Sequence, residues 1–141
     1  MNHKQKVLAY FYRRNASKLQ VLVFDHQGMP EAGTQIVGGT VEENEDLKLA
    51  LKREIFEEAG IIIEENELTF LANTTYQRKD RPEINHRTYF KIDGAKLPEH
   101  WSHRVISDGE DNGLIFLFYW IPLEQAFEKL TGNFAECLHL I

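Results

Sequence analysis

One stretch of this chain, Gly39–Ile61, combines clustered acidic residues with flanking glycines. It reads GTVEENEDLKLALKREIFEEAGI, and Glu54, Glu57 and Glu58 stand in it at positions i, i+3 and i+4. On an α-helix these positions share one face. Three neighbouring carboxylates repel one another, so the pattern is unfavourable for stability alone. A hard divalent cation would compensate the charge, because Mg²⁺ and Mn²⁺ prefer oxygen ligands.

A solvated acidic surface is the simpler interpretation of such a helix. Further residues favour a binding site instead. Arg53 directly precedes the acidic cluster, and Glu45 stands where the helical pattern begins. The pair Gly38-Gly39 allows the backbone to approach a ligand closely. Gly60 suits the left-handed residue that ends a helix.

The spacing of these residues resembles the Nudix box. Gly39 is followed after five residues by Glu45 and after seven more by the segment 53–61, which reads REIFEEAGI. All nine fixed or class-restricted positions of the box agree over 23 residues, which is far more specific than a lone glycine motif. The one departure lies just outside these positions, where Val37 stands in place of the proline of many members.

The resemblance implies an α/β fold, a Nudix-type α/β/α sandwich with a mixed β-sheet. It also implies a MutT-like hydrolase that cleaves the pyrophosphate bond of a nucleoside diphosphate linked to another moiety. The implied cofactor is Mg²⁺, or Mn²⁺ in its place. The implied metal ligands are Glu54, Glu57, Glu58 and the carbonyl oxygen of Gly38.

The catalytic residues are expected in and beyond the box. In the family the general base is a box glutamate, here Glu57 or Glu58, or a carboxylate from a later loop. The segment 107–113, SDGEDNG, is such a loop, and we expect Glu110 in it to act as the base. A solvated polar turn is the alternative for this loop. Arg53 is expected to orient the carboxylates, and a surface ion pair with the upstream box glutamate fits it equally well.

Substrate phosphates require cations. Arg78, Lys79, Arg81 and Arg87 cluster around one strand connection. We expect the three arginines to contact the substrate, because a guanidinium fork suits phosphate oxygens. We expect Tyr76 to stack on a base. The alternatives are solubilising charges on a hairpin and an aromatic residue in the core.

Hydrophobic patterns predict the remaining elements. Strands are expected over residues 6–14, 19–25, 34–37, 68–77, 86–92, 103–107 and 114–121, and helices over 45–59 and from Pro122 onward. The segment 114–121 is expected to be a central strand. The last helix is expected to bury Leu123, Phe127 and Leu130 and to end at Gly132. This order of elements indicates a mixed sheet flanked by helices.

Composition limits the class of protein. A chain of 141 residues is expected to form one domain, residues 1–141. The net charge of −6 argues against a stable nucleic-acid partner. The single Cys137 excludes an internal disulfide and fits a reducing compartment. No apolar run is long enough for a membrane span. We therefore expect a cytoplasmic monomer or homodimer that acts on a small nucleotide substrate.

Two other functions fit the same family resemblance. One is an isomerase similar to isopentenyl diphosphate isomerase, whose chemistry uses a cysteine as an acid/base partner. It is disfavoured because the sole cysteine, Cys137, lies in the C-terminal tail. The other is a ligand-sensing Nudix domain without catalysis. Such domains often lose box residues, whereas this box is complete.

Overall fold

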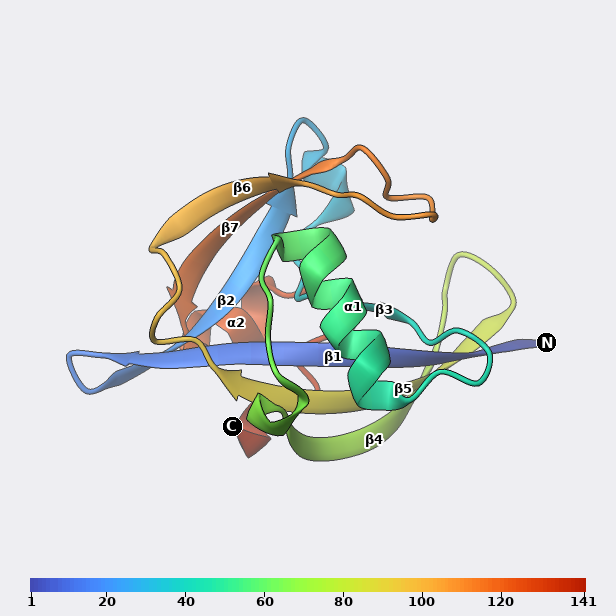
Figure 1. Ribbon diagram of the computed structural model, residues 1–141, viewed down its shortest axis with the longest axis horizontal. Coiled ribbons are helices and arrows are strands. Elements are labelled where there is room, and N and C mark those ends of the chain that lie inside the picture. The colour runs from blue at the N-terminus through green and yellow to red at the C-terminus, as the bar shows by residue number, and fades with distance from the viewer.

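A mixed β-sheet of seven strands forms the centre of the computed structural model, which describes residues 1–141. The spatial order is β4-β5-β1-β2-β7-β6, with β3 paired to β1. The strands are β1 (Asn2–Asn15), β2 (Lys18–His26), β3 (Gly38–Thr40), β4 (Thr69–Gln77), β5 (Glu83–Asp93), β6 (His100–Arg104) and β7 (Ile115–Pro122). Only β1 and β5 run parallel. Because β1 pairs with β2, β3 and β5, it is the strand around which the sheet is built (Figure 1).

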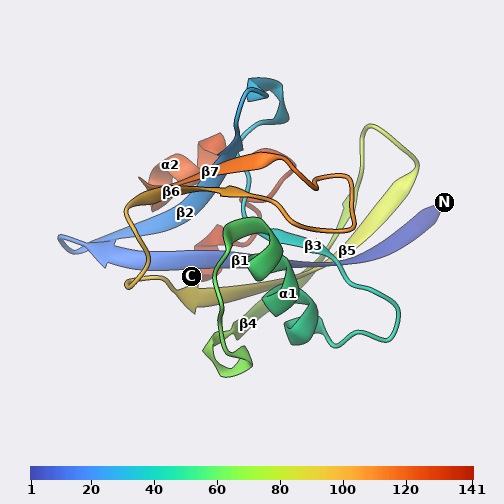
Figure 2. The same ribbon diagram turned by 45° about the horizontal axis from the view of Figure 1, so that its top comes forward.

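Two helices cover opposite faces of this sheet. Figure 1 shows α1 (Leu47–Ala59) in front of β1 and α2 (Leu123–Lys129) behind the sheet, and the turned view of Figure 2 separates them again. Leu51 and Ile55 of α1 pack in one hydrophobic cluster, whereas Ala126 of α2 packs in another. Short 3₁₀ helices span Pro30–Ala32, Glu65–Glu67 and Leu138–Leu140. The predicted mixed sheet between helices is confirmed.

Successive side chains of β1 point to opposite faces of the sheet, and this divides the core into the two clusters. Val7 and Ala9 face α1, and Leu8 and Tyr10 face α2 and the C-terminal segment. All four side chains are at most 3% exposed, as expected for a strand at the centre of a sheet that is covered on both sides. No helix combines the length and the apolar character that a membrane span requires.

Local chemistry sets the limits of α1. The Asp46 carboxylate accepts hydrogen bonds from the amides of Lys48 and Leu49 at 3.1 and 3.3 Å, so the helix begins after Asp46, two residues later than predicted. At the other end, Gly60 has φ of 74° and its amide donates to the Phe56 carbonyl. The predicted left-handed glycine at the end of the helix is therefore confirmed.

Several other predicted limits were wrong, and three of them concern the surroundings of the helices. Residues 34–37 form only isolated bridges, and the strand before α1 is the glycine segment Gly38–Thr40 itself. The strand predicted over 103–107 ends at Arg104, because the chain then turns toward α1 and the Ile106 amide donates to the Glu57 carbonyl at 3.3 Å. The last helix stops at Lys129, before Gly132. Within that helix Phe127 is 45% exposed and is not part of the core.

Candidate active site

The acidic cluster lies where α1 packs against β3. The Glu54 carboxylate occupies the space beside Gly39, where an added Cβ would lie 2.2 Å from its carboxyl carbon. Glu58 is only 7% exposed, and its Oε1 accepts a hydrogen bond from the Gly38 amide at 2.9 Å. A larger residue at Gly39 would displace Glu54, and a Cβ at Gly38 would lie 2.4 Å from the Val7 carbonyl oxygen of β1. The glycine pair therefore allows the helix and the strand to bring carboxylates and backbone together.

Arg53 connects the members of this cluster. Its Nε and Nη2 donate to the two carboxylate oxygens of Glu45, each at 2.9 Å. Its Nη1 donates to Glu54 at 2.9 Å and to Glu57 at 3.3 Å, and Nη2 also donates to the Thr40 carbonyl at 3.1 Å. In this geometry one guanidinium both pairs with Glu45 and orients two of the predicted metal ligands.

Burial makes the cluster electrostatically unfavourable without a cation. It raises the pKa of Glu54 to about 7 although Arg53 opposes the shift. Burial and the charge of Glu54 raise the pKa of Glu58 well above its usual value. The hydrogen bond from Arg53 lowers the pKa of Glu45. Arg53 thus pairs with three carboxylates and leaves the buried Glu58 without a cation partner. Because the ionised forms of Glu54 and Glu58 are costly here, an added cation would be stabilised.

The donor set fits a hard divalent cation. Glu54, Glu57 and Glu58 offer only oxygen atoms, which Mg²⁺ prefers. No three acidic, histidine or cysteine side chains are grouped closely enough to hold a metal ion in the present arrangement. Arg53 binds Glu54 and Glu57, while Glu58 is turned toward Gly38. Metal binding would therefore require the glutamate side chains to rotate.

The loop between β6 and β7 approaches the end of α1. The hydrogen bond from Ile106 to Glu57 anchors the start of this loop at the helix. Glu110, the predicted base, is exposed and its side chain makes no hydrogen bond. The neighbouring Asp111 carboxylate lies close enough for its charge to help raise the pKa of Glu58. The pattern SDGEDNG did not single out Asp111, because a loop sequence does not show which of its acids comes near the acidic cluster.

A polar area lies on the sheet face opposite α1, next to β3. Its side chains are Lys4, Lys6, Thr74, Tyr76, Glu83, Asn85 and Arg87, from β1, β4 and β5. Lys6 donates from Nζ to Thr40 Oγ1 at 2.7 Å. Burial lowers the pKa of Lys6, and the charges of Glu83 and, more weakly, Glu54 act against that shift. The sequence did not point to Lys6, because a single lysine in a strand pattern gives no sign that it reaches Thr40 of the box strand.

Two of the predicted substrate residues hold the C-terminal segment. Arg87 is 3% exposed, and its guanidinium lies 4.0 Å from the ring centre of Tyr76 and 4.5 Å from that of Phe134. Its Nη1 donates to Glu136 at 3.0 Å, and Tyr89 donates to the same carboxylate at 2.6 Å. Arg87 and Tyr76 are therefore engaged with neighbouring side chains, and Arg87 also lines a polar pocket of about 410 Å³ between β1, β4 and β5.

The other two predicted arginines lie in the connection between β4 and β5. Arg78 donates to both carboxylate oxygens of Asp80, at 2.8 and 2.7 Å, and lies 3.6 Å from Glu83. Arg81 is nearly half exposed and lies 3.5 Å from Asp80. All three predicted arginines thus have carboxylate partners in this structure, and their contact with substrate stays a prediction.

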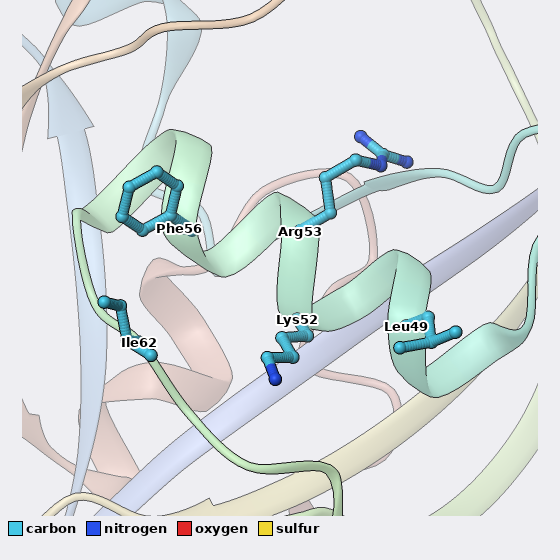
Figure 3. Close-up of a pocket in the computed structure, with 5 residues that line it drawn as sticks. All are labelled: Leu49, Lys52, Arg53, Phe56 and Ile62. Carbon is cyan, nitrogen blue, oxygen red and sulfur yellow. The ribbon is translucent and has the colours of Figure 1, made fainter.

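A separate shallow groove of about 360 Å³ lies on the outer surface of α1, lined by Leu49, Lys52, Arg53, Phe56 and Ile62. Figure 3 shows Lys52 and Arg53 pointing to opposite sides of the helix. Phe56 and Ile62 lie near its C-terminal end and are 54% and 74% exposed. None of the three glutamates of the cluster lines this groove.

Solved structures with the same fold are Nudix proteins. The MutT NUDIX hydrolase from Burkholderia pseudomallei matches with a TM-score of 0.74 and 20% identity, covering 100% of this chain and 99% of that one. The NUDIX domain of Shewanella oneidensis NrtR, complexed with ADP ribose, gives 0.68 and 13%, covering 99% and 86%. A C. elegans Ap4A hydrolase in a binary complex gives 0.63 and 20%, covering 96% and 93%. At these identities the matches show a shared fold.

A family model shows membership of a family, and not only a shared fold. The model described as NUDIX domain matches residues 2–140. No curated protein matches this chain. The family match includes the complete box from Gly39 to Ile61, whose helix, glycine pair and carboxylates the structure brings together. This chain therefore belongs to the NUDIX domain family.

Proposed function

We propose that this protein is a Mg²⁺-dependent pyrophosphohydrolase that acts on a nucleoside diphosphate linked to another moiety. The observation that carries the proposal is the group of partly buried box glutamates at the junction of α1 and β3, which one guanidinium neutralises only in part. Membership of the NUDIX domain family supports hydrolysis of small nucleotide-derived molecules. Two structural neighbours, a MutT NUDIX hydrolase and an Ap4A hydrolase, support this class of reaction.

The proposed reaction needs a cation, a water molecule and a proton acceptor. Glu54, Glu57, Glu58 and the Gly38 carbonyl would hold Mg²⁺. The bound cation would neutralise the charge of the diphosphate. Arg53 keeps the carboxylates oriented through the hydrogen bonds described above. A carboxylate takes a proton from the attacking water while the oxygen of that water bonds to phosphorus. The bond between phosphorus and the bridging oxygen breaks, and the bridging oxygen leaves with the other phosphate group.

The carboxylate that accepts this proton comes, in our proposal, from the loop between β6 and β7. Glu110 and Asp111 are the candidates there. Asp111 is favoured because its charge reaches Glu58. Both residues follow Ile106, whose amide fixes the start of the loop at the end of α1.

The two alternatives are disfavoured by separate observations. An isomerase would need a reactive cysteine, but Cys137 is 2% exposed and burial raises the pKa of its thiol to about 11. It also lies in the C-terminal segment, against Tyr10 on the sheet face opposite α1. A sensing domain without catalysis would not need the complete set of box carboxylates that this chain retains.

A substrate screen tests the proposal. Nucleoside triphosphates, sugar nucleotides, dinucleoside polyphosphates and dinucleotide cofactors would each be incubated with the protein in Mg²⁺ and in EDTA, and the products identified by mass. We expect cleavage of at least one class at a pyrophosphate bond in Mg²⁺ only. Binding of a nucleotide without cleavage would favour the sensing domain, and equal cleavage in EDTA would contradict the metal dependence.

A further inference from the structure

Lys6 differs from the other cations on its face of the sheet. Lys4 lies 3.6 Å from Glu83, Arg78 pairs with Asp80, and Arg87 pairs with Glu136. Lys6 has no carboxylate within ion-pair distance, and its one hydrogen-bond acceptor is the Thr40 hydroxyl. An ammonium group carries three donors. Two donors of this half-buried lysine are therefore free for a ligand.

Lys6 reaches β3 from the sheet face opposite α1, and the acidic cluster meets the other side of the same short strand. Thr40 receives hydrogen bonds on both of its oxygens, from Lys6 at the hydroxyl and from Arg53 at the carbonyl. Thr40 directly follows Gly38-Gly39, the glycine pair that contacts the carboxylates. Lys6 is thus tied to the same short strand that receives the box glutamates.

The surroundings leave the charge of Lys6 without a close counter-ion. The nearby buried carboxylate of Glu83 already accepts a hydrogen bond from Asn85 at 2.8 Å, and both Lys4 and Arg78 lie 3.6 Å from it. A partly desolvated ammonium without a close counter-ion is costly, and an anionic ligand relieves that cost.

We propose that Lys6 binds a phosphate group of the substrate next to the carboxylates of α1. This inference rests on the pyrophosphohydrolase function proposed above. The two free N–H groups of the ammonium would donate charge-assisted hydrogen bonds to non-bridging phosphate oxygens. Thr40 holds the ammonium in place, so little side-chain freedom is lost on binding. Lys6 would thus fix the diphosphate from the side of the sheet, while the metal neutralises it from the side of the helix.

Calorimetry with methylenediphosphonate tests this role without turnover. This anion contains a P–C–P linkage that water cannot cleave as a pyrophosphate, and it lacks a base or sugar. In the presence of Mg²⁺ we expect Lys6→Met to weaken its binding by about ten- to a hundredfold, the usual worth of hydrogen bonds to a charged group. Lys6→Arg keeps the charge and should retain part of the affinity. Lys52→Met is the matched control, because it removes the same charge from the outer surface of α1, where Lys52 points away from Arg53.

Several outcomes would overturn the role of Lys6. The first is that wild-type protein does not bind the anion. The second is that Lys6→Met binds it with the affinity of wild type. The third is that Lys6→Met and Lys52→Met lose the same affinity. The last result would show an effect of net charge alone. If Lys6→Met does not fold, Thr40→Val replaces it. That variant releases the ammonium, and it should weaken binding severalfold if Lys6 holds the phosphate and leave it unchanged if Lys6 does not.

Hydrolysis assays on the same preparations separate this inference from the proposed function. Binding that depends on Lys6, together with no hydrolysis of any substrate class, would refute the enzyme and keep the phosphate site. Hydrolysis by wild-type protein with the same KM in Lys6→Met would keep the enzyme and refute the site.

Discussion

Glu54, Glu57 and Glu58 occupy different surroundings although they lie within one turn of helix. Glu58 is buried against the Gly38 amide, and Glu54 is held beside Gly39. Of the two helix glutamates that Arg53 binds, Glu57 has the more exposed side chain, 19% against 14% for Glu54, and the longer hydrogen bonds to Arg53. Glu57 is therefore the carboxylate that most easily turns toward a cation.

Replacing Glu58 should separate its structural role from its metal role. Glu58→Gln resembles the neutral acid that burial favours and still offers an oxygen to the Gly38 amide. We expect this variant to melt at the wild-type temperature or above it in EDTA and to lose most of the stabilisation that Mg²⁺ provides. Melting curves with and without Mg²⁺ measure both effects. A large loss of stability in EDTA would show that the charged form of Glu58 is required for folding.

The two loop acids give a second comparison of single residues. If a loop carboxylate is the base, Asp111→Asn or Glu110→Gln should lower the maximal rate by about ten- to a thousandfold while the apparent affinity for metal changes less. We expect the larger effect at Asp111, because its charge reaches Glu58. The rate at saturating Mg²⁺ would be measured against pH, and the base variant should lose the acidic limb. Unchanged profiles in both would return the role to a box glutamate.

At the scale of elements, α1 and β3 form the site because each supplies what the other lacks. The helix contributes carboxylates, and the strand contributes glycines that allow these carboxylates to approach the backbone. Asp46 fixes where the helix begins and thus which residues face the strand. The start of α1 is therefore set by a residue that lies outside the acidic cluster.

Removing the helix cap should lower stability without abolishing activity. Asp46→Ala leaves two backbone amides without their acceptor and should reduce the free energy of unfolding by about 1 kcal/mol. Urea unfolding measures this loss, and Glu43→Ala, at an exposed position in the preceding turn, is the control. Activity at saturating Mg²⁺ should stay near wild type in both variants. No change in the unfolding midpoint of Asp46→Ala would show that the cap contributes nothing.

The elements of the sheet and the acidic helix follow from sequence patterns, and the tertiary details do not. Alternation and apolar runs locate most strands, and the spacing of Glu54, Glu57 and Glu58 places them on one helical face. The burial of Arg87 depends on Glu136, which is distant in sequence, so the hairpin pattern gave no sign of it. The contact between Lys6 and Thr40 likewise requires β1 and β3 to be paired.

Across the whole molecule, the acidic cluster makes stability depend on pH and on metal. The folded pKa of Glu54 is about 7 and that of Glu58 is also raised, against an ordinary value of 4.5. Between those values the folded protein binds more protons than the unfolded chain, so the stability of the metal-free protein falls as pH rises from 4.5 through 7. Mg²⁺ binds the ionised carboxylates and should oppose this fall.

Melting curves across this range test that dependence. In EDTA we expect the melting temperature to decrease by a few degrees between about pH 5 and pH 8, with the sign given by linkage. Excess Mg²⁺ should raise the melting temperature, and more so at the higher pH, where fewer protons compete with the metal. Glu54→Gln should flatten the dependence in EDTA. A melting temperature that rises with pH in EDTA would contradict the assigned protonation of the cluster.

The single-domain organisation and the oligomeric state expected from the sequence stay predictions, and neither affects the central claim. That claim is that the carboxylates of α1 drive Mg²⁺-dependent hydrolysis of a pyrophosphate bond. Turnover of the substrate found in the screen, at saturating Mg²⁺, tests it most directly in wild-type protein and Glu57→Gln. We predict a loss of at least about a hundredfold with a melting temperature in EDTA near wild type, because one charged ligand is lost. Turnover near the wild-type rate in Glu57→Gln would contradict the account.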